Sequence, residues 1–108
     1  MTDKEFEFQY ALGTLSYDDL LKIASRSLSK YILTTLSKDE DRDVRKWVAL
    51  NPYTPINVLI ELSYDKNWIV RYWLADNPLL PKEVLIRLSR DSRISARQIH
   101  RIKRYPKV

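Results

Sequence analysis

The sequence predicts an all-α protein built from a repeated pair of short helices, and three observations support this. The chain of 108 residues contains one glycine, whereas strands and hairpins rely on glycine for turns with positive φ. Apolar residues recur at the i, i+3, i+4 spacing of an amphipathic helix, as in Val44, Trp47 and Val48. Residues 44–65 and 70–91 align with 13 identities in 22 positions, so internal repetition governs the fold.

The first 31 residues are expected to form N-terminal capping helices of a single domain that spans 1–108. The segment SYDDLLKIASRS predicts a helix with Ser16 as its N-cap and Asp19 three residues later, a variant of the capping box. This segment lacks both the Asn-Pro corner and the arginine of the later copies. We therefore interpret it as a degenerate end unit that covers the repeats.

The repeat core is expected at residues 32–91, with 26 residues in each unit. Asn51 precedes a proline and is pushed out of the α region, which ends the first helix of its unit. The second helix is expected to begin at Pro55, because a missing N–H is harmless in the first helical turn. Thr54 is the predicted N-cap of that helix, and Leu80 replaces it in the next copy.

Acidic and basic residues recur in register with the repeat. Asp39, Asp65 and Asp91 follow the second helix of each unit, and an arginine follows each of them by six residues (Arg45, Arg71, Arg97). The preferred interpretation is a structural Asp–Arg ladder between successive units, in which each guanidinium binds carboxylate or helix-end carbonyl oxygens. A row of anion-binding arginines is the alternative.

Trp47 and Trp73 stand at equivalent positions of the two copies and are expected to belong to the core. Trp68 differs, because its counterparts in the neighbouring copies are Arg42 and Ile94. The repeat does not require an aromatic side chain there. Trp68 is therefore a candidate contact residue with partial exposure.

These motifs resemble a known family. The pattern D-x-x-x-x-V-R-x-x-V/L-A-x-N-P-x-x-P-x-x-V-L-x-x-L-S-x-D occurs twice, from Asp39 to Asp65 and from Asp65 to Asp91. It resembles the leucine-rich repeat variant, which is related in architecture to HEAT-like repeats. The resemblance implies a short right-handed α-solenoid of paired short helices, some of them of the 3₁₀ type. It implies a scaffold and no reaction.

Positive charge gathers at the C-terminal end of the sequence. Residues 1–43 carry 6 basic and 9 acidic side chains, whereas residues 87–108 carry 8 basic side chains and one acidic. Residues 92–108 are expected to form a basic C-terminal capping helix and tail, helical from about Ser92 to Lys103. Two interpretations stay open, a solvated cap and a basic binding surface. The arginines of that surface would be Arg87, Arg90, Arg93, Arg97, Arg101 and Arg104.

No catalytic, metal-binding or cofactor-binding residue is predicted. The chain has no cysteine and one histidine, His100, which leaves no set of soft metal ligands and no His-based relay. One glycine does not make a phosphate-binding loop. An enzyme related to HEAT-like alkylpurine DNA glycosylases is disfavoured, because Asp76 near Trp73 is the single pairing that the sequence offers for it.

The expected function is that of a non-catalytic binding scaffold. An acidic protein is the first candidate partner for the basic end, and DNA or RNA bound through phosphate contacts is the alternative. A second copy of the chain is a further candidate, as a homodimer through exposed repeat ends. The acidic N-terminus lacks the apolar segment of a signal peptide, and no stretch is apolar enough to span a membrane. The expected location is the cytoplasm.

Overall fold

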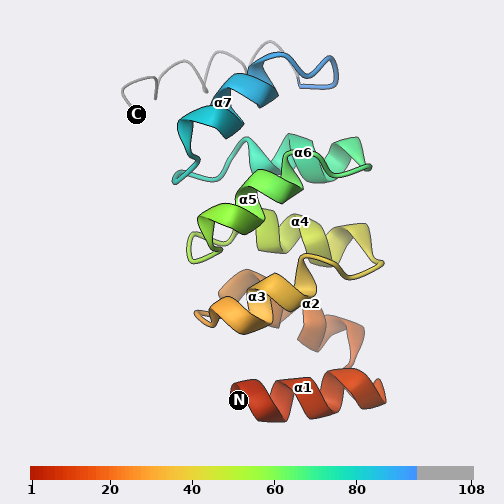
Figure 1. Cartoon of the computed structure of the whole chain (residues 1–108). Coiled ribbons are helices and arrows are strands. Elements are labelled where there is room, and N and C mark those ends of the chain that lie inside the picture. Colours follow the sequence, from red (N-terminus) through yellow and green to blue (C-terminus); the bar gives the residue numbers. More distant parts are fainter. Residues whose placement is uncertain (95–108) are drawn as a thin grey trace.

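The computed structural model describes residues 1–94, and within this range all secondary structure is α-helical (Figure 1). The predicted all-α class is confirmed for these residues, but none of the described helices is of the 3₁₀ type. Seven helices follow one another: α1 (Asp3–Leu12), α2 (Tyr17–Arg26), α3 (Lys30–Leu36), α4 (Arg42–Leu50), α5 (Ile56–Leu62), α6 (Trp68–Leu74) and α7 (Lys82–Ser89). None of these described helices is long and apolar enough to cross a membrane.

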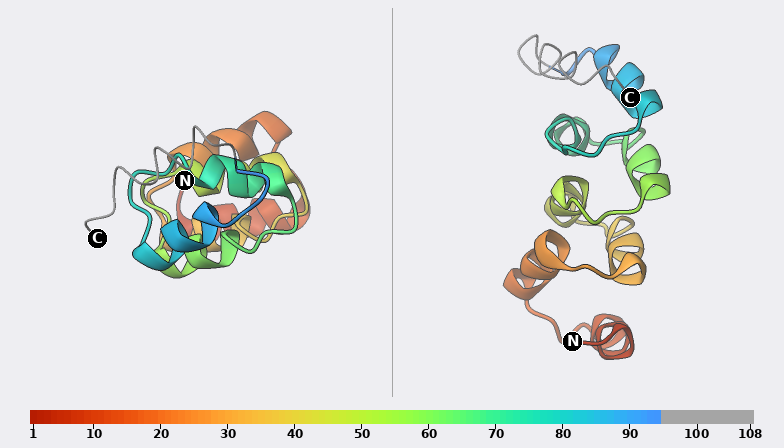
Figure 2. Two further views of the ribbon diagram at one scale, coloured as in Figure 1. Left: turned by 90° about the horizontal axis from the view of Figure 1, so that it is seen from above. Right: turned by 90° about the vertical axis from the view of Figure 1, so that its left-hand side faces the viewer.

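The helices lie in two columns that run along the long axis of the molecule. Helix α4 packs between α2 and α6 in one column, while α1 contacts α3 and α5 contacts α7 in the other (Figure 2). The chain therefore alternates between the columns as it climbs from α1 to α7. The principal extents are 41 × 23 × 17 Å, so the molecule is elongated along the direction in which the helices stack.

Buried apolar side chains form one continuous core between the two columns. Helix α4 contributes Val44 and Val48, and α6 contributes Val70 and Leu74, each with no exposed surface. The second column contributes its own buried residues at 26-residue intervals, with Leu33 on α3, Leu59 on α5 and Leu85 on α7. Each helix is too short to be stable alone, so burial of these side chains must hold the stack together.

The two tryptophans at equivalent positions do not share one environment. Trp47 is partly buried against the core, whereas Trp73 has 36% of its surface exposed. The prediction that both belong to the core is therefore wrong for Trp73. The Lys46 ammonium lies over both rings, 5.1 Å from the Trp47 centroid and 5.6 Å from the Trp73 centroid.

The helix starts are fixed by side chains that accept backbone N–H groups. Ser16 accepts from Asp19, as its spacing predicts, and Thr2 forms a reciprocal capping box with Glu5 at the start of α1. Asp41 caps α4, and Asn67, 26 residues later, caps α6. Helix α1 ends at Gly13, whose φ of 70° is the left-handed conformation that favours glycine.

Thr54 is not the N-cap of α5, which corrects the prediction. Pro55 occupies the N-cap position itself and α5 begins at Ile56. The Thr54 hydroxyl instead donates to the carbonyl oxygen of Val48, 2.6 Å away in a buried site. Thr54 therefore ties the end of α4 to the corner, and the apolar Leu80 fills the equivalent buried position without a hydrogen bond of this kind.

Candidate functional site

The Asp and Arg side chains that recur in the sequence bind one another between successive helix pairs. The Arg45 guanidinium forms a two-point contact with the Asp65 carboxylate, at 2.8 Å from Nε and 3.2 Å from Nη2. Its Nη1 donates to the carbonyl oxygens of Asp39 and Glu40. Arg45 is 6% exposed, so this guanidinium is a packed structural element.

Arg71 repeats this arrangement one unit later. Its Nε donates to the Asp91 carboxylate and its Nη1 to the carbonyl oxygen of Asp65. Burial acts to raise the pKa of Asp91, but the hydrogen bonds from Arg71 and from the Arg93 backbone N–H outweigh it and hold that pKa below its usual value. The two ladder arginines that the structure describes, Arg45 and Arg71, are therefore occupied with structural partners.

At the N-terminal end of the ladder, a tyrosine takes the place of the arginine. The residue 20 positions before Asp39 is Asp19 rather than an arginine, and the Tyr10 hydroxyl donates to the Asp39 carboxylate instead. Tyr17 donates to Asp41 at 3.1 Å in the same acidic loop. Partial burial and this acceptor raise the pKa of Tyr17 to about 12. Nothing in the repeat pattern pointed to these tyrosines.

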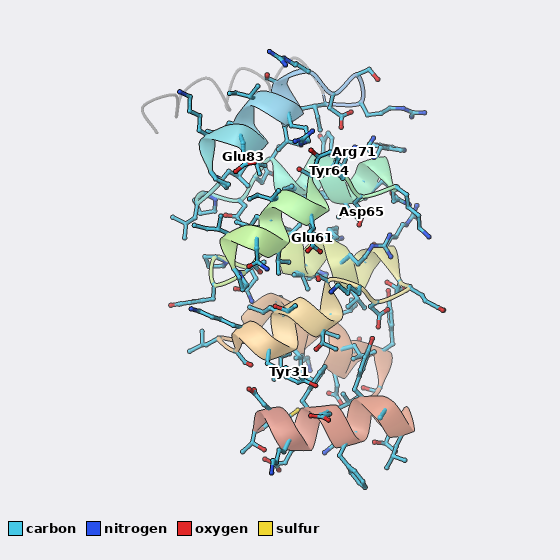
Figure 3. The ribbon with its side chains drawn as sticks, in the orientation of Figure 1. Tyr31, Glu61, Tyr64, Asp65, Arg71 and Glu83 are labelled. Atoms are coloured by element: carbon cyan, nitrogen blue, oxygen red, sulfur yellow. The ribbon has the colours of Figure 1, made fainter. Side chains whose placement is uncertain are left out.

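A groove of about 640 Å³ lies above the ladder, between the end of α5 and helix α7. Figure 3 shows Tyr64, Asp65 and Arg71 close together beside the loop that leaves α5, with Glu83 on α7 to their left. The groove combines the exposed apolar surfaces of Tyr64 and Ile86 with charged groups of both signs. Its lining consists of Ser63, Tyr64, Arg71, Glu83, Ile86, Arg87, Arg90 and Asp91.

Arg87 is held flat against an exposed tyrosine in this groove. Its guanidinium carbon lies 3.6 Å from the centre of the Tyr64 ring, a close cation–π contact. Glu83 precedes Arg87 by four residues on α7, a spacing that allows a helical ion pair. Within residues 1–94, however, the ion pairs are Arg45–Asp65, Lys46–Asp43 and Arg71–Asp91. Arg87 therefore has no ion-pair partner among the described residues.

A second arginine lies against an exposed tryptophan. The Arg93 guanidinium carbon is 5.6 Å from the centre of the Trp68 ring, and Trp68 is 39% exposed, as the repeat comparison predicted. Edge-on contacts continue from Trp68 to Tyr72 and from Tyr72 to Trp73. Cationic and aromatic groups thus run without a break from the turn after α7 to helix α6.

The structure brings together part of the predicted basic surface. Arg87, Arg90, Arg93 and Trp68 lie among the described residues, at the end of the molecule where α7 packs on the lower helices. Arg97, Arg101 and Arg104 lie outside the described residues, as does most of the predicted helix from Ser92 to Lys103. Ser92 and Arg93 themselves form a turn, closed by the Ile94 N–H on the Asp91 carbonyl oxygen, so no helix begins at Ser92.

The stacking of arginine on aromatic rings is the feature that the sequence did not reveal. A signal for it was present, because Tyr64 and Arg87 stand where Lys38 and Glu61 stand one copy earlier. Both members of that pair differ between the copies. Within residues 1–94, no group of three or more histidine, cysteine, aspartate and glutamate side chains is arranged to hold a metal ion.

No protein-family model, no characterised protein and no solved structure matches the chain. The interpretation of the site therefore rests on its own residues.

Proposed function

We propose that the chain is a non-catalytic scaffold that binds an acidic protein partner through the basic and aromatic surface beside α7. One observation carries this proposal: Arg87, Arg90 and Arg93 take part in no ion pair among the described residues, and two of them lie against exposed aromatic rings. The ladder arginines, in contrast, are bound to aspartates.

The composition of this surface supports a protein partner. Tyrosine, tryptophan and arginine are enriched among the residues that dominate protein interfaces. Glu83 lines the same groove, and its negative charge opposes the close approach of a continuous phosphate backbone. Short-range charge complementarity to an acidic protein tolerates such a mixed lining.

We further propose that the helices form a short right-handed α-solenoid of the leucine-rich repeat variant type. The repeated sequence motif supports this, together with hydrogen bonds that recur at equivalent positions: Asn51 and Asn77 each donate from Nδ2 to carbonyl oxygens of the preceding unit. In this proposal residues 1–31 and 92–108 are the caps and 32–91 the repeat core. The scaffold acts in the cytoplasm, and self-association through its ends stays a prediction.

Nucleic-acid binding is the alternative function. The observation in its favour is the run of aromatic and cationic side chains from Arg93 through Trp68 to Trp73, since bases stack on exposed aromatic rings beside positive charge. If about four to six phosphates were neutralised, the logarithm of the affinity would fall against log salt with a slope of roughly −4 to −5.

A titration with charge-matched probes separates the two functions. Fluorescence anisotropy would follow a labelled poly-glutamate peptide, a DNA single strand and a duplex, each at about 50 and about 200 mM salt. We expect the peptide to bind more tightly than either DNA at both concentrations. Tighter binding of DNA with the steep salt slope would favour the alternative, and no binding of any probe would contradict both functions.

A triple variant tests the location of the surface. Replacing Arg87, Arg90 and Arg93 with serine should weaken peptide binding by about tenfold or more, because each lost charge removes an attraction at the interface. The matched control replaces Lys22, Arg26 and Lys30, three exposed cations near the other end of the molecule, with serine. Equal weakening in both variants would show that net charge alone, and not this surface, attracts the peptide.

A further inference from the structure

We infer that the groove between Tyr64 and α7 is a specific site for one carboxylate side chain of the partner, an aspartate or glutamate that is flanked by an apolar residue. This inference rests on the proposed function and names the recognition chemistry within it. The groove offers a volume of about 640 Å³, a cation that lies against an aromatic ring, and apolar lining from Tyr64 and Ile86.

The position of Arg87 is set before any ligand arrives. Its Nε is buried without a hydrogen-bond partner among the described residues, and the Tyr64 ring supports the plane of its guanidinium. A guanidinium held in this way has lost most of its rotational freedom already, which lowers the entropic cost of binding an anion. Its terminal nitrogens form a planar fork that matches the two oxygens of a carboxylate.

The charge balance of the groove favours a singly charged group. Arg71 is neutralised by Asp91, which leaves Arg87 and Arg90 as cations against Glu83. The net excess within the lining is therefore one positive charge, which a carboxylate compensates. A phosphate group carries close to two negative charges at neutral pH, so one of them would stay uncompensated beside the Glu83 carboxylate.

The apolar walls indicate what flanks the carboxylate. Tyr64 is 62% exposed and Ile86 is 42% exposed, and both line the groove together with Arg87. Apolar area of this kind gains free energy when a neighbouring side chain covers it. We therefore expect an apolar residue directly before or after the acidic one.

The preceding unit provides an internal comparison. A smaller hollow of about 330 Å³ lies beside the ladder there and is lined by Lys38, Asp39, Glu40, Arg45, Asp65 and Lys66. It shares a ladder pair with the groove, here Arg45 and Asp65, but Glu61 and Tyr64, the counterparts of Arg87 and Arg90, do not line it. Of the two hollows, only the groove is lined by an arginine that lies against an aromatic ring.

The test compares two tripeptides that differ in one charge, acetyl-Leu-Glu-Leu-amide and acetyl-Leu-Gln-Leu-amide. NMR titration of the full chain would follow backbone N–H signals and the arginine Nε–Hε signals. We expect the glutamate peptide to shift the signals of Tyr64, Ile86, Arg87 and Arg90 saturably, and the glutamine peptide to bind at least about tenfold more weakly. The Nε–Hε signal of Arg45 should not move, because its guanidinium is already bound to Asp65.

Two single variants make the result specific. Arg87→Gln should weaken binding of the glutamate peptide by about tenfold. Arg42→Gln should leave binding unchanged, because it removes the same charge from an exposed position on α4. Circular dichroism of both variants would verify that the helices are retained.

The outcomes separate this inference from the proposed function. If the glutamate tripeptide does not bind saturably, or if Arg42→Gln weakens it as much as Arg87→Gln, the carboxylate site is wrong. Should poly-glutamate still bind through the arginine surface in that case, the proposed function stands without the site. Loss of both interactions would overturn both.

Discussion

Asp91 belongs both to the structural ladder and to the lining of the groove. The pH dependence of its protonation tests whether its pairing with Arg71 stabilises the fold. Its carboxylate accepts from Arg71 Nε and from the Arg93 backbone N–H, and the net effect is a lowered pKa. A carboxyl group whose pKa is lower in the folded state stabilises the fold above its unfolded pKa of about 3.9. That contribution is lost as the pH falls through the lowered folded-state pKa.

Asp91→Asn should therefore destabilise the protein in a pH-dependent manner. At pH 7 we expect a loss of roughly 2 kcal/mol in the free energy of unfolding, the usual effect of removing a charge-assisted hydrogen bond. The loss should shrink as the pH falls from about 3.9, where the carboxyl of the unfolded chain takes up a proton, and should vanish below the lowered folded-state pKa. Urea unfolding across this pH range measures the difference, and the exposed Asp18→Asn provides the control. A loss that is constant with pH would contradict the pairing of Asp91 with Arg71.

Residue-scale prediction from the sequence succeeded where a contact is local or is repeated. The spacing of Asp and Arg predicts their contact because both recur in register with the core, and the partial exposure of Trp68 follows from its mismatch with the other copies. The environment of Trp73 could not be predicted in the same way. Its exposure depends on which helix covers it, and Lys46 reaches its ring from a different helix.

At the scale of single helices, the corner around Thr54 shows how a side chain near a helix start can serve the preceding helix. An N-cap accepts a backbone N–H, but the Thr54 hydroxyl donates to the Val48 carbonyl oxygen at the end of α4. Sequence alone does not separate these roles, because a hydroxyl both donates and accepts. Pro55 decides between them by occupying the cap position of α5 itself.

Thr54→Asp distinguishes the two roles directly. A carboxylate does not donate to the Val48 carbonyl oxygen and would be buried beside it, so the free energy of unfolding should fall by about 1–3 kcal/mol. Ser16→Asp is the matched control, because Ser16 does accept from the N–H of Asp19 and aspartate is an equally good N-cap. Urea denaturation measures both variants. If Thr54→Asp is as well tolerated as Ser16→Asp, Thr54 acts as a cap.

Helix existence was more predictable than helix boundaries. Apolar spacing and Asn-Pro corners located α4 and α5 to within a few residues, and the Ser16 cap located the start of α2. The signal at Thr2 and Glu5 is the same S/T-x-x-E pattern and would have located α1 as well. The expected helix from Ser92 failed at its start, because Asp91 accepts the Arg93 N–H and closes a turn there.

Across the whole molecule, repeated and divergent positions have different roles. Positions shared by the copies hold the stack together, as the buried valines and the Asn51 and Asn77 side chains do. The surface beside α7 is formed where the copies differ: Arg87 replaces Glu61 of the earlier copy, and Arg90 replaces Tyr64. A single sequence with an internal repeat therefore separates structural from functional candidates without any second protein.

The partner, in contrast, was not determined by the repeat. The charge distribution led us to propose a binding surface at the basic end, but charge does not distinguish an acidic protein from nucleic acid. The contacts of Arg87 with Tyr64 and of Arg93 with Trp68 favour an acidic protein over nucleic acid as the proposed partner. They define a small site with little net charge, which suits a single carboxylate better than a phosphate backbone. Such contacts join side chains far apart in the sequence, so composition and periodicity do not predict them.

The central claim is that binding resides where the copies differ, and transplanting residues from one copy to the other tests it most directly. Arg87→Glu combined with Arg90→Tyr gives the later unit the residues of positions 61 and 64. The control, Arg26→Glu combined with Lys30→Tyr, makes the same change of charge near the other end of the molecule.

The measurement is the affinity for labelled poly-glutamate. We predict a loss of at least about tenfold for the transplanted variant, with thermal unfolding close to that of the wild type and little loss in the control. Affinity that survives the transplant, or falls equally in the control, would contradict the claim.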